Sequence, residues 1–252
     1  MIDPGSLSLA GRLAVITGGA SGIGAATARC LAAAGADVII GFHRNEERAQ
    51  ELLRTLPPGQ HGIVRLELED PGTFEALSQD IAARRGKLHI LVNSAGFTRA
   101  IPHADLDALT DELFEQILIS NVRGPYSAIR ALHSLLVASG DAVVVNVSSI
   151  SGFTASGSNV AYCAAKAALD NLCMSLGRAL GPDVRILNVS PGAVATDFVP
   201  GRDRTMLEAA AKSTPLRRVI EPEDVAAAVL ACVTHLRVST GTTIVVDGGR
   251  HL

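Results

Sequence analysis

The stretch TGGASGIG (residues 17–24) follows the apolar run LAVIT (residues 13–17) and leads into an alanine-rich segment. Glycines in such a turn let the backbone bend sharply and approach a pyrophosphate, and a further glycine lets a helix pack closely on a strand. The start of that helix offers free N–H groups and the positive end of its dipole to an anion. Gly18, Gly22 and Gly24 have TGxxxGxG spacing rather than GxGxxG spacing. An ordinary tight turn is the alternative, but the position at a first strand–helix junction favours phosphate binding.

Further apolar runs of strand length follow this turn along the chain. They lie at 37–42, 63–68, 88–93, 142–148, 184–190 and 242–247. They are β-branched and apolar throughout, which is typical of strands covered on both faces. Segments of helical periodicity separate them, at about 23–34, 45–56, 73–85, 111–138, 159–180 and 223–235. The alternation predicts an α/β, single-domain, Rossmann-like fold with a doubly wound seven-stranded parallel sheet and helices on both faces.

No linker or internal repeat divides the chain, so we expect one NAD(P)-binding domain over residues 1–252. Residues 1–6 are set aside as a candidate tag or disordered segment. Residues 191–218 contain three prolines and no strand pattern. Irregular segments of this length in a compact domain are usually functional, so we expect a substrate flap there.

The composition excludes several classes of protein. A net charge of −3 argues against a nucleic-acid partner, which would favour a basic surface. The four cysteines are scattered without a CxxC pair, so we expect reduced thiols rather than disulfides or a metal site. The longest apolar run is far too short to cross a bilayer, and the N-terminus has no signal-peptide pattern. We therefore expect a soluble cytoplasmic protein with no membrane partner and no metal.

The second expected strand ends in GFHR (residues 41–44), without the acid that would hydrogen-bond both ribose hydroxyls of NAD. Arg44, with His43 beside it, is suited to pair with a 2′-phosphate. The alternative is that Arg44 only begins a solvated helix. NADP is the favoured cofactor, and NAD remains open.

Tyr162 and Lys166 stand four residues apart on an expected helix, so their side chains leave the same face. An adjacent ammonium stabilises a phenolate and lowers the tyrosine pKa from about 10 towards the working range. A lone YxxxK pair is more often an exposed helix pair. Here, however, Ser149 lies at the mouth of a buried strand and Asn121 interrupts a long helical segment. Both fall near the carboxyl ends of strands, where a doubly wound sheet binds its ligands.

Over residues 7–249 the chain resembles the short-chain dehydrogenase/reductase family. The matched motifs are TGGASGIG (17–24), NSAG (93–96), Asn121, VNVSS (145–149), YCAAK (162–166), SPG with Thr196 (190–196) and VDGG (246–249). The resemblance implies an NAD(P)-dependent oxidoreductase that moves hydride between a nicotinamide and a carbonyl or secondary alcohol without a metal. Members similar to 3-oxoacyl-carrier-protein reductases make a β-ketoacyl thioester one candidate substrate. Sugars, polyols and cyclic alcohols stay open.

The resemblance also implies roles for single residues. Tyr162 would be the general acid or base, Ser149 would hydrogen-bond the substrate oxygen, and Asn121 would hold a water in a proton relay. Lys166 would hold the nicotinamide ribose and tune Tyr162. The full set of expected cofactor contacts is Gly18, Ser21, Gly22, Ile23, Gly24, His43, Arg44, Glu67, Leu68, Asn93, Ala95, Gly96, Tyr162, Lys166, Pro191, Gly192, Val194 and Thr196.

Some positions depart from the family pattern. Ser21 stands where many NADP-preferring members have a basic residue, which weighs against NADP. Ser94 stands where a second asparagine is common, and Glu67 where an aspartate is usual. A cofactor-binding regulator or structural subunit without catalysis is the alternative function, which the complete set of catalytic residues disfavours.

Two further expectations concern the substrate and the assembly. Arg99 lies at the expected pocket rim, where it either meets an acidic substrate or, more often in such positions, is solvated. Apolar residues near the pocket suggest an apolar substrate site: Ile101, Phe153, Phe198 and Val199. Leucines repeat along the expected 159–180 helix at positions 169, 172, 176 and 180. If they form a second apolar stripe, a homotetramer is favoured over a dimer; if they face their own sheet, they carry no such meaning.

Overall fold

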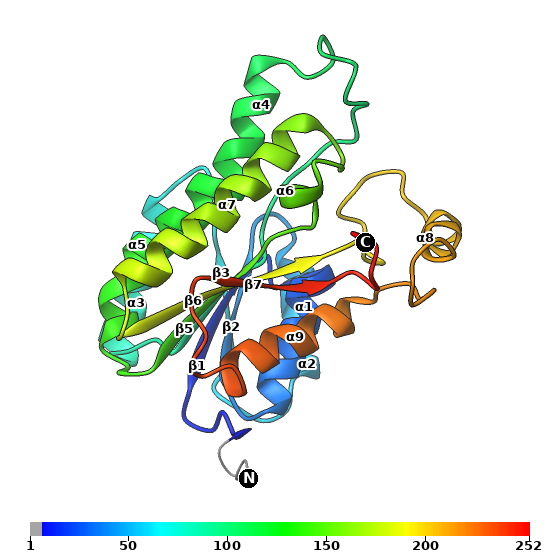
Figure 1. Ribbon diagram of the computed structural model, residues 1–252. Coiled ribbons are helices and arrows are strands. Elements are labelled where there is room, and N and C mark those ends of the chain that lie inside the picture. The colour runs from blue at the N-terminus through cyan, green and yellow to red at the C-terminus, as the bar shows by residue number, and fades with distance from the viewer. Residues whose placement is uncertain (1–6) are drawn as a thin grey trace.

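The computed structural model describes residues 7–252 and contains one seven-stranded parallel sheet (Figure 1). The strand order is β3-β2-β1-β4-β5-β6-β7, so the direction of winding reverses at β1 and β4. The strands are β1 (Leu13–Thr17), β2 (Asp37–Phe42), β3 (Gly62–Arg65), β4 (Ile90–Asn93), β5 (Ala142–Val147), β6 (Val184–Pro191) and β7 (Thr242–Val246). The doubly wound α/β fold expected from the sequence is confirmed.

Helices cover both faces of the sheet. They are α1 (Gly22–Ala33), α2 (Glu46–Thr55), α3 (Gly72–Arg84), α4 (Asp111–Leu118), α5 (Gly124–Val137), α6 (Ser151–Thr154), α7 (Val160–Ala179), α8 (Arg204–Ala211) and α9 (Pro222–Thr234). Figure 1 shows α1, α2 and α9 on one face and α3, α5 and α7 on the other. Residues of these two groups belong to two separate core clusters, one on each face.

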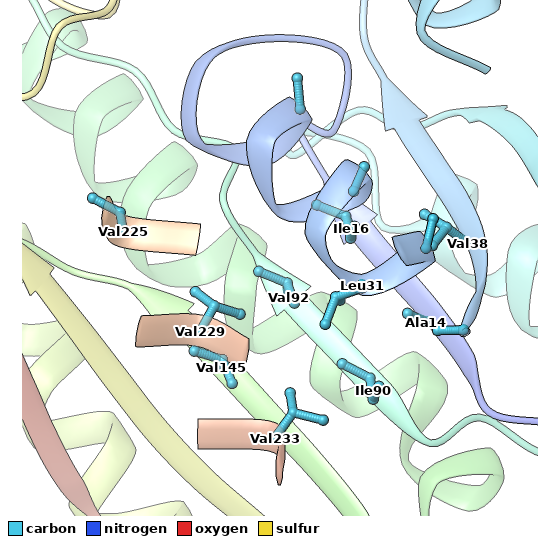
Figure 2. Close-up of a cluster of buried hydrophobic side chains, with 14 of the residues drawn as sticks. Ala14, Ile16, Leu31, Val38, Ile90, Val92, Val145, Val225, Val229 and Val233 are labelled. Atoms are coloured by element: carbon cyan, nitrogen blue, oxygen red, sulfur yellow. The ribbon is translucent and has the colours of Figure 1, made fainter. Parts of the chain in front are cut away.

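The strand β1 shows why the sequences of the strands are mostly continuous apolar runs. Its Ala14 and Ile16 join the cluster beneath α1 and α9, while Leu13 and Val15 join the cluster on the opposite face. Successive side chains of a strand point to opposite faces, so a strand covered on both sides is apolar at most positions. Figure 2 shows Ile16 in this first cluster, with Leu31 of α1 and Val229 of α9 nearby.

Several boundaries differ from the sequence expectation for identifiable reasons. The strand expected at 63–68 ends at Arg65, because its only neighbour in the sheet, β2, ends at the paired residue Phe42. The strand expected from residue 88 begins at Ile90, because the Leu13 N–H bonds to the His89 ring at 3.0 Å rather than to a backbone carbonyl. The expected long helix at 111–138 is split by a π-helical segment at 119–123.

The segment 191–218 is less irregular than its sequence suggests. It begins with Pro191 still paired in β6, and it contains the two-turn helix α8. Just beyond it, Ile220 forms a bridge to Val194. Pro191 therefore ties the start of the segment to the sheet, and the bridge ties its two ends to each other. The candidate tag at residues 1–6 lies outside the described residues.

Within residues 7–252, none of the helices combines the length and the apolar character needed to span a bilayer.

Candidate active site

A cavity of about 1410 Å³ lies along the carboxyl ends of the central strands. Its walls include Thr17 at the end of β1, Phe42 at the end of β2, Val147 at the end of β5 and Pro191 at the end of β6. This edge of a doubly wound sheet is where ligands bind. The volume exceeds the few hundred to about 1,000 Å³ of ordinary small-ligand sites, as a dinucleotide with a second molecule requires.

The glycine turn forms one wall of this cavity and fits a pyrophosphate. Gly18 and Gly22 have φ values of +63° and +49°, which favour glycine. A Cβ on Gly18 would lie 2.9 Å from the Ala95 Cα, and a Cβ on Gly24 would overlap the Gly18 carbonyl. No side chain caps the first turn of α1, and that turn holds no acidic residue. Its N–H groups are therefore presented to an anion, so the structure fits a dinucleotide.

The adenosine end of the cavity carries more basic residues than the sequence suggested. His43 and Arg44 line it as expected, and Asn45 and Arg48 line it too. Asn45 caps α2 by accepting a hydrogen bond from the Arg48 N–H at 2.9 Å, which fixes the start of that helix. Among the described residues, neither Arg44 nor Arg48 forms an ion pair. Sequence reasoning did not single out Arg48. Its position four residues after Arg44 was the feature that could have indicated that both line the cavity.

Tyr162 lies at the opposite end of the cavity, on the first turn of α7. The Asn159 side chain caps this helix by accepting the Tyr162 N–H at 2.8 Å, and it also donates to the Arg99 carbonyl at 2.8 Å. The cap thus joins α7 to the loop after β4. Ser149, which also lines the cavity, accepts the Ser151 N–H at 3.1 Å and donates to the Ser151 hydroxyl at 3.1 Å.

Burial raises the pKa of Tyr162 above its usual value, while the Ser149 hydroxyl and the charge of Arg202 act in the opposite direction. The expected lowering of the Tyr162 pKa by Lys166 stays a prediction. The Lys166 Nζ lies over the tyrosine ring, 5.5 Å from its centroid. The phenol is therefore protonated at neutral pH, as a proton donor must be.

Lys166 is buried and donates from Nζ to the Val147 carbonyl at 2.9 Å. Burial lowers its pKa to about 8, and the negative charge of Asp170, one turn further along α7, acts to raise it. The ammonium therefore remains charged at neutral pH but loses its proton in mildly alkaline solution. Sequence reasoning did not single out Asp170, although its i, i+4 spacing from Lys166 was a visible signal.

Asn121 lies inside the π-helical segment between α4 and α5 and is almost fully buried. Its side-chain nitrogen donates to the carbonyls of Phe97 at 2.7 Å and Ile117 at 2.9 Å. Its side-chain oxygen is buried and has no hydrogen-bond partner among the described residues. A Cβ on Gly96 would lie 2.7 Å from this oxygen, so the glycine leaves room for it beside the cavity wall.

Asn93 belongs to a buried ladder of amides that crosses the sheet. Its nitrogen donates to Asn146 at 2.9 Å, Asn146 donates to Asn188 at 2.9 Å, and Asn188 donates to Asp170 at 2.7 Å. These bonds link β4, β5 and β6 to α7 and give the three amide nitrogens partners, whereas the Asn93 side-chain oxygen has none among the described residues. The ladder ends at the Asp170 carboxylate, whose charge acts to raise the Lys166 pKa. It therefore connects the three strands to the helix that carries Lys166.

Most of the expected site residues line the one cavity. Those that do so are Gly18, Ser21, Gly22, Ile23, His43, Arg44, Leu68, Ala95, Gly96, Ser149, Tyr162, Lys166, Pro191, Gly192, Val194 and Thr196. Gly24, Glu67, Asn93 and Asn121 are not part of its wall. Gly24 packs against Gly18, and the Glu67 carboxylate is turned towards Arg65 at 2.7 Å.

The substrate end of the cavity is more polar than expected. Phe198 and Val199 line it, but Ile101 and Phe153 do not. Arg99 is exposed and lies outside the wall, whereas Arg202 and Arg250 are part of it. The sequence pattern did not predict that these two arginines line the cavity. They lie outside the helices and strands and come from distant parts of the chain.

Comparisons with known proteins agree with this geometry. A family model described as enoyl-(acyl carrier protein) reductase matches residues 18–251. The chain is 38% identical over 242 residues to a protein of Streptomyces violaceoruber named as ketoacyl reductase 2 of the granaticin polyketide synthase, covering 95% of this chain and 96% of that one. It is 35% identical over 248 residues to cis-4-hydroxycyclohexanecarboxylate dehydrogenase of Sinomonas cyclohexanicum, covering 96% and 97%.

A solved structure points in the same direction. The crystal structure of a short-chain dehydrogenase from Burkholderia cenocepacia in complex with NADP aligns with a TM-score of 0.87 and 33% identity, covering 97% of this chain and 99% of that one. Because the relatives are named as reductases and dehydrogenases, the alternative of a non-catalytic regulator is not favoured. The chain belongs to the short-chain dehydrogenase/reductase family and is an NAD(P)-dependent oxidoreductase.

Proposed function

We propose that the protein is a carbonyl reductase or alcohol dehydrogenase that prefers NADP and uses Tyr162 as its general acid or base. One observation carries the proposal: Tyr162, Ser149 and Lys166 line the same cavity as the glycine turn, at its other end. The cofactor gives hydride to a carbonyl carbon or takes it from an alcohol carbon when it is bound. The residues of the chain then have to bind the reacting oxygen and move its proton.

In the reducing direction Tyr162 donates its proton to the carbonyl oxygen, which the Ser149 hydroxyl holds by a hydrogen bond. The raised pKa keeps Tyr162 protonated before the reaction. The Lys166 ammonium, which lies over the tyrosine ring, supplies positive charge as the phenolate forms. The Asn121 oxygen, which has no partner among the described residues, supports a role in returning a proton to Tyr162, since a buried acceptor normally has a partner.

Preference for NADP rests on the basic residues at the adenosine end. Arg44 and Arg48 line the cavity where β2 ends in Phe42 rather than an acid. A guanidinium group binds two phosphate oxygens through parallel hydrogen bonds. No carboxylate is present at the end of β2 to repel the 2′-phosphate. A relative with NADP bound supports the same preference.

The two curated relatives suggest different substrates. One is named as a ketoacyl reductase and the other acts on a cyclic hydroxycarboxylate, so both a ketoacyl thioester and a cyclic alcohol are candidates here. The segment 191–218 supplies Thr196, Phe198, Val199 and Arg202 to the cavity. It is therefore suited to act as the flap that selects the substrate.

A panel of ketones and alcohols, assayed with NADPH and with NADH, tests the function. Absorbance of the reduced nicotinamide reports each reaction. We expect turnover of at least one carbonyl compound with NADPH, and a lower KM for NADPH than for NADH. Complete inactivity across the panel with both cofactors would contradict an enzymatic role, and a lower KM for NADH would contradict the cofactor preference.

We further propose a homotetramer working in the cytoplasm. The expected leucine stripe does not support it, because Leu169 is fully buried and Leu176 and Leu180 pack against the core of their own subunit. Support comes instead from the edge strand β7, where Val245 is exposed, and from the exposed Met174 on α7. The four free cysteines fit a reducing compartment.

A further inference from the structure

Two arginines lie at the Tyr162 end of the cavity. Arg202 belongs to the flap, just before α8, and Arg250 belongs to the turn that follows β7. Figure 1 shows the C-terminus next to the loop that leads to α8. The two segments also touch directly, since the Leu216 N–H donates to the Gly248 carbonyl at 3.0 Å.

Neither guanidinium is neutralised by the described part of the chain. Within residues 7–252, no carboxylate lies within 4.0 Å of Arg202 or Arg250, and Asp197, which also lines the cavity, pairs with neither. Partial burial and the positive charge of Arg250 lower the pKa of Arg202, and the Tyr162 hydroxyl acts in the opposite direction. Two positive charges without a carboxylate partner among the described residues therefore line the cavity that also contains Tyr162.

The turn that carries Arg250 is held in a fixed conformation. The buried Asp247 carboxylate accepts the Gly249 N–H at 2.8 Å and the His251 N–H at 2.9 Å, on either side of Arg250. The His251 ring lies 2.7 Å from the same carboxylate and packs edge-on against Phe153. These bonds fix the backbone of the turn on both sides of Arg250, so the point from which its side chain extends into the cavity is set before an anion binds.

We propose that Arg202 and Arg250 form a subsite for a carboxylate of the substrate, so that the protein acts on oxo acids and hydroxy acids. Guanidinium groups bind a carboxylate through paired, charge-assisted hydrogen bonds, which also orient the molecule. The phosphates of the cofactor are already provided for by the glycine turn and by Arg44 and Arg48 at the other end. The subsite rests on the proposed function, because it orients the carbonyl carbon relative to Tyr162.

The test compares acids with neutral molecules of the same shape. Reduction of 4-oxocyclohexanecarboxylate and of a linear series of oxo acids is measured with NADPH, each beside its own carboxamide. We expect a KM at least about tenfold lower for the best acid than for its amide. In Arg202→Gln and Arg250→Gln the KM for acids should rise about tenfold to a hundredfold. The KM of each acid then comes close to the KM of its own amide. Arg99→Gln, an exposed arginine outside the cavity wall, is the matched control and should keep the ratio.

Binding to the protein–NADPH complex, followed by nicotinamide fluorescence, separates the subsite from the reaction. If no carbonyl compound reacts, the proposed function fails, and the titration with acid and amide still decides the subsite. Equal binding of acid and amide to the wild-type complex overturns the carboxylate subsite. So does an acid preference that survives both arginine substitutions, or turnover confined to amides and neutral ketones.

Discussion

The charge on Lys166 should set the alkaline limit of carbonyl reduction. Burial lowers its pKa to about 8, so about nine tenths of the molecules carry the ammonium at pH 7 and about a tenth at pH 9. Burial raises the pKa of Tyr162, which therefore stays protonated over this interval. Since reduction needs both protons in place, kcat/KM should fall about tenfold from pH 7 to pH 9, with the slope of a single proton.

Two variants test whether Lys166 causes this fall of kcat/KM at alkaline pH, which is the alkaline limb of the pH profile. The negative charge of Asp170 raises the Lys166 pKa, so Asp170→Asn should move the limb to lower pH while Asn188 keeps an oxygen to which it can donate. Lys166→Arg keeps a positive charge at every pH in this range, so its remaining activity should lack the limb. The assay is the initial rate of NADPH oxidation with the best substrate of the panel, from pH 6 to pH 10. A limb that does not move in Asp170→Asn, or that persists in Lys166→Arg, would refute the reasoning.

Three other results follow from the structure. Arg44→Gln and Arg48→Gln should each raise the KM for NADPH about tenfold but leave the KM for NADH in place; equal changes for both would contradict a 2′-phosphate site. Gly24→Ala should destabilise the fold by about 1–3 kcal/mol in denaturant unfolding, because its Cβ meets the Gly18 carbonyl; unchanged stability would argue against this tight contact. Light scattering should give about four times the 26.1 kDa chain mass, and a mass near one chain would end the tetramer proposal.

The strand–helix alternation could be predicted from the sequence because local patterning determines it. A strand such as β1 is apolar at most positions, since Ile16 and Val15 enter cores on opposite faces. Ends of elements depend on neighbours instead. The early end of β3 at Arg65 follows from where β2 stops, and no residue of β3 itself records that.

The same distinction applies to the candidate site. Tyr162, Ser149 and the glycine turn are marked by spacing within single elements, and they line one cavity. Arg202 and Arg250 line the same cavity because the flap packs on the C-terminal turn, so local patterns could not pair them. Leu176 and Leu180 show the converse: their spacing suggested an exposed stripe, but helical spacing alone does not reveal which face meets the sheet.

The central claim is that Tyr162 transfers the proton in an NAD(P)-dependent carbonyl–alcohol reaction. Tyr162→Phe keeps the ring beside Phe198 but removes the hydroxyl, and the direct measurement is its turnover with NADPH and the best substrate of the panel. The account predicts a loss of about two to four orders of magnitude in kcat, with NADPH binding measured by fluorescence in the same samples unchanged. Turnover within a few-fold of the wild-type protein would contradict it.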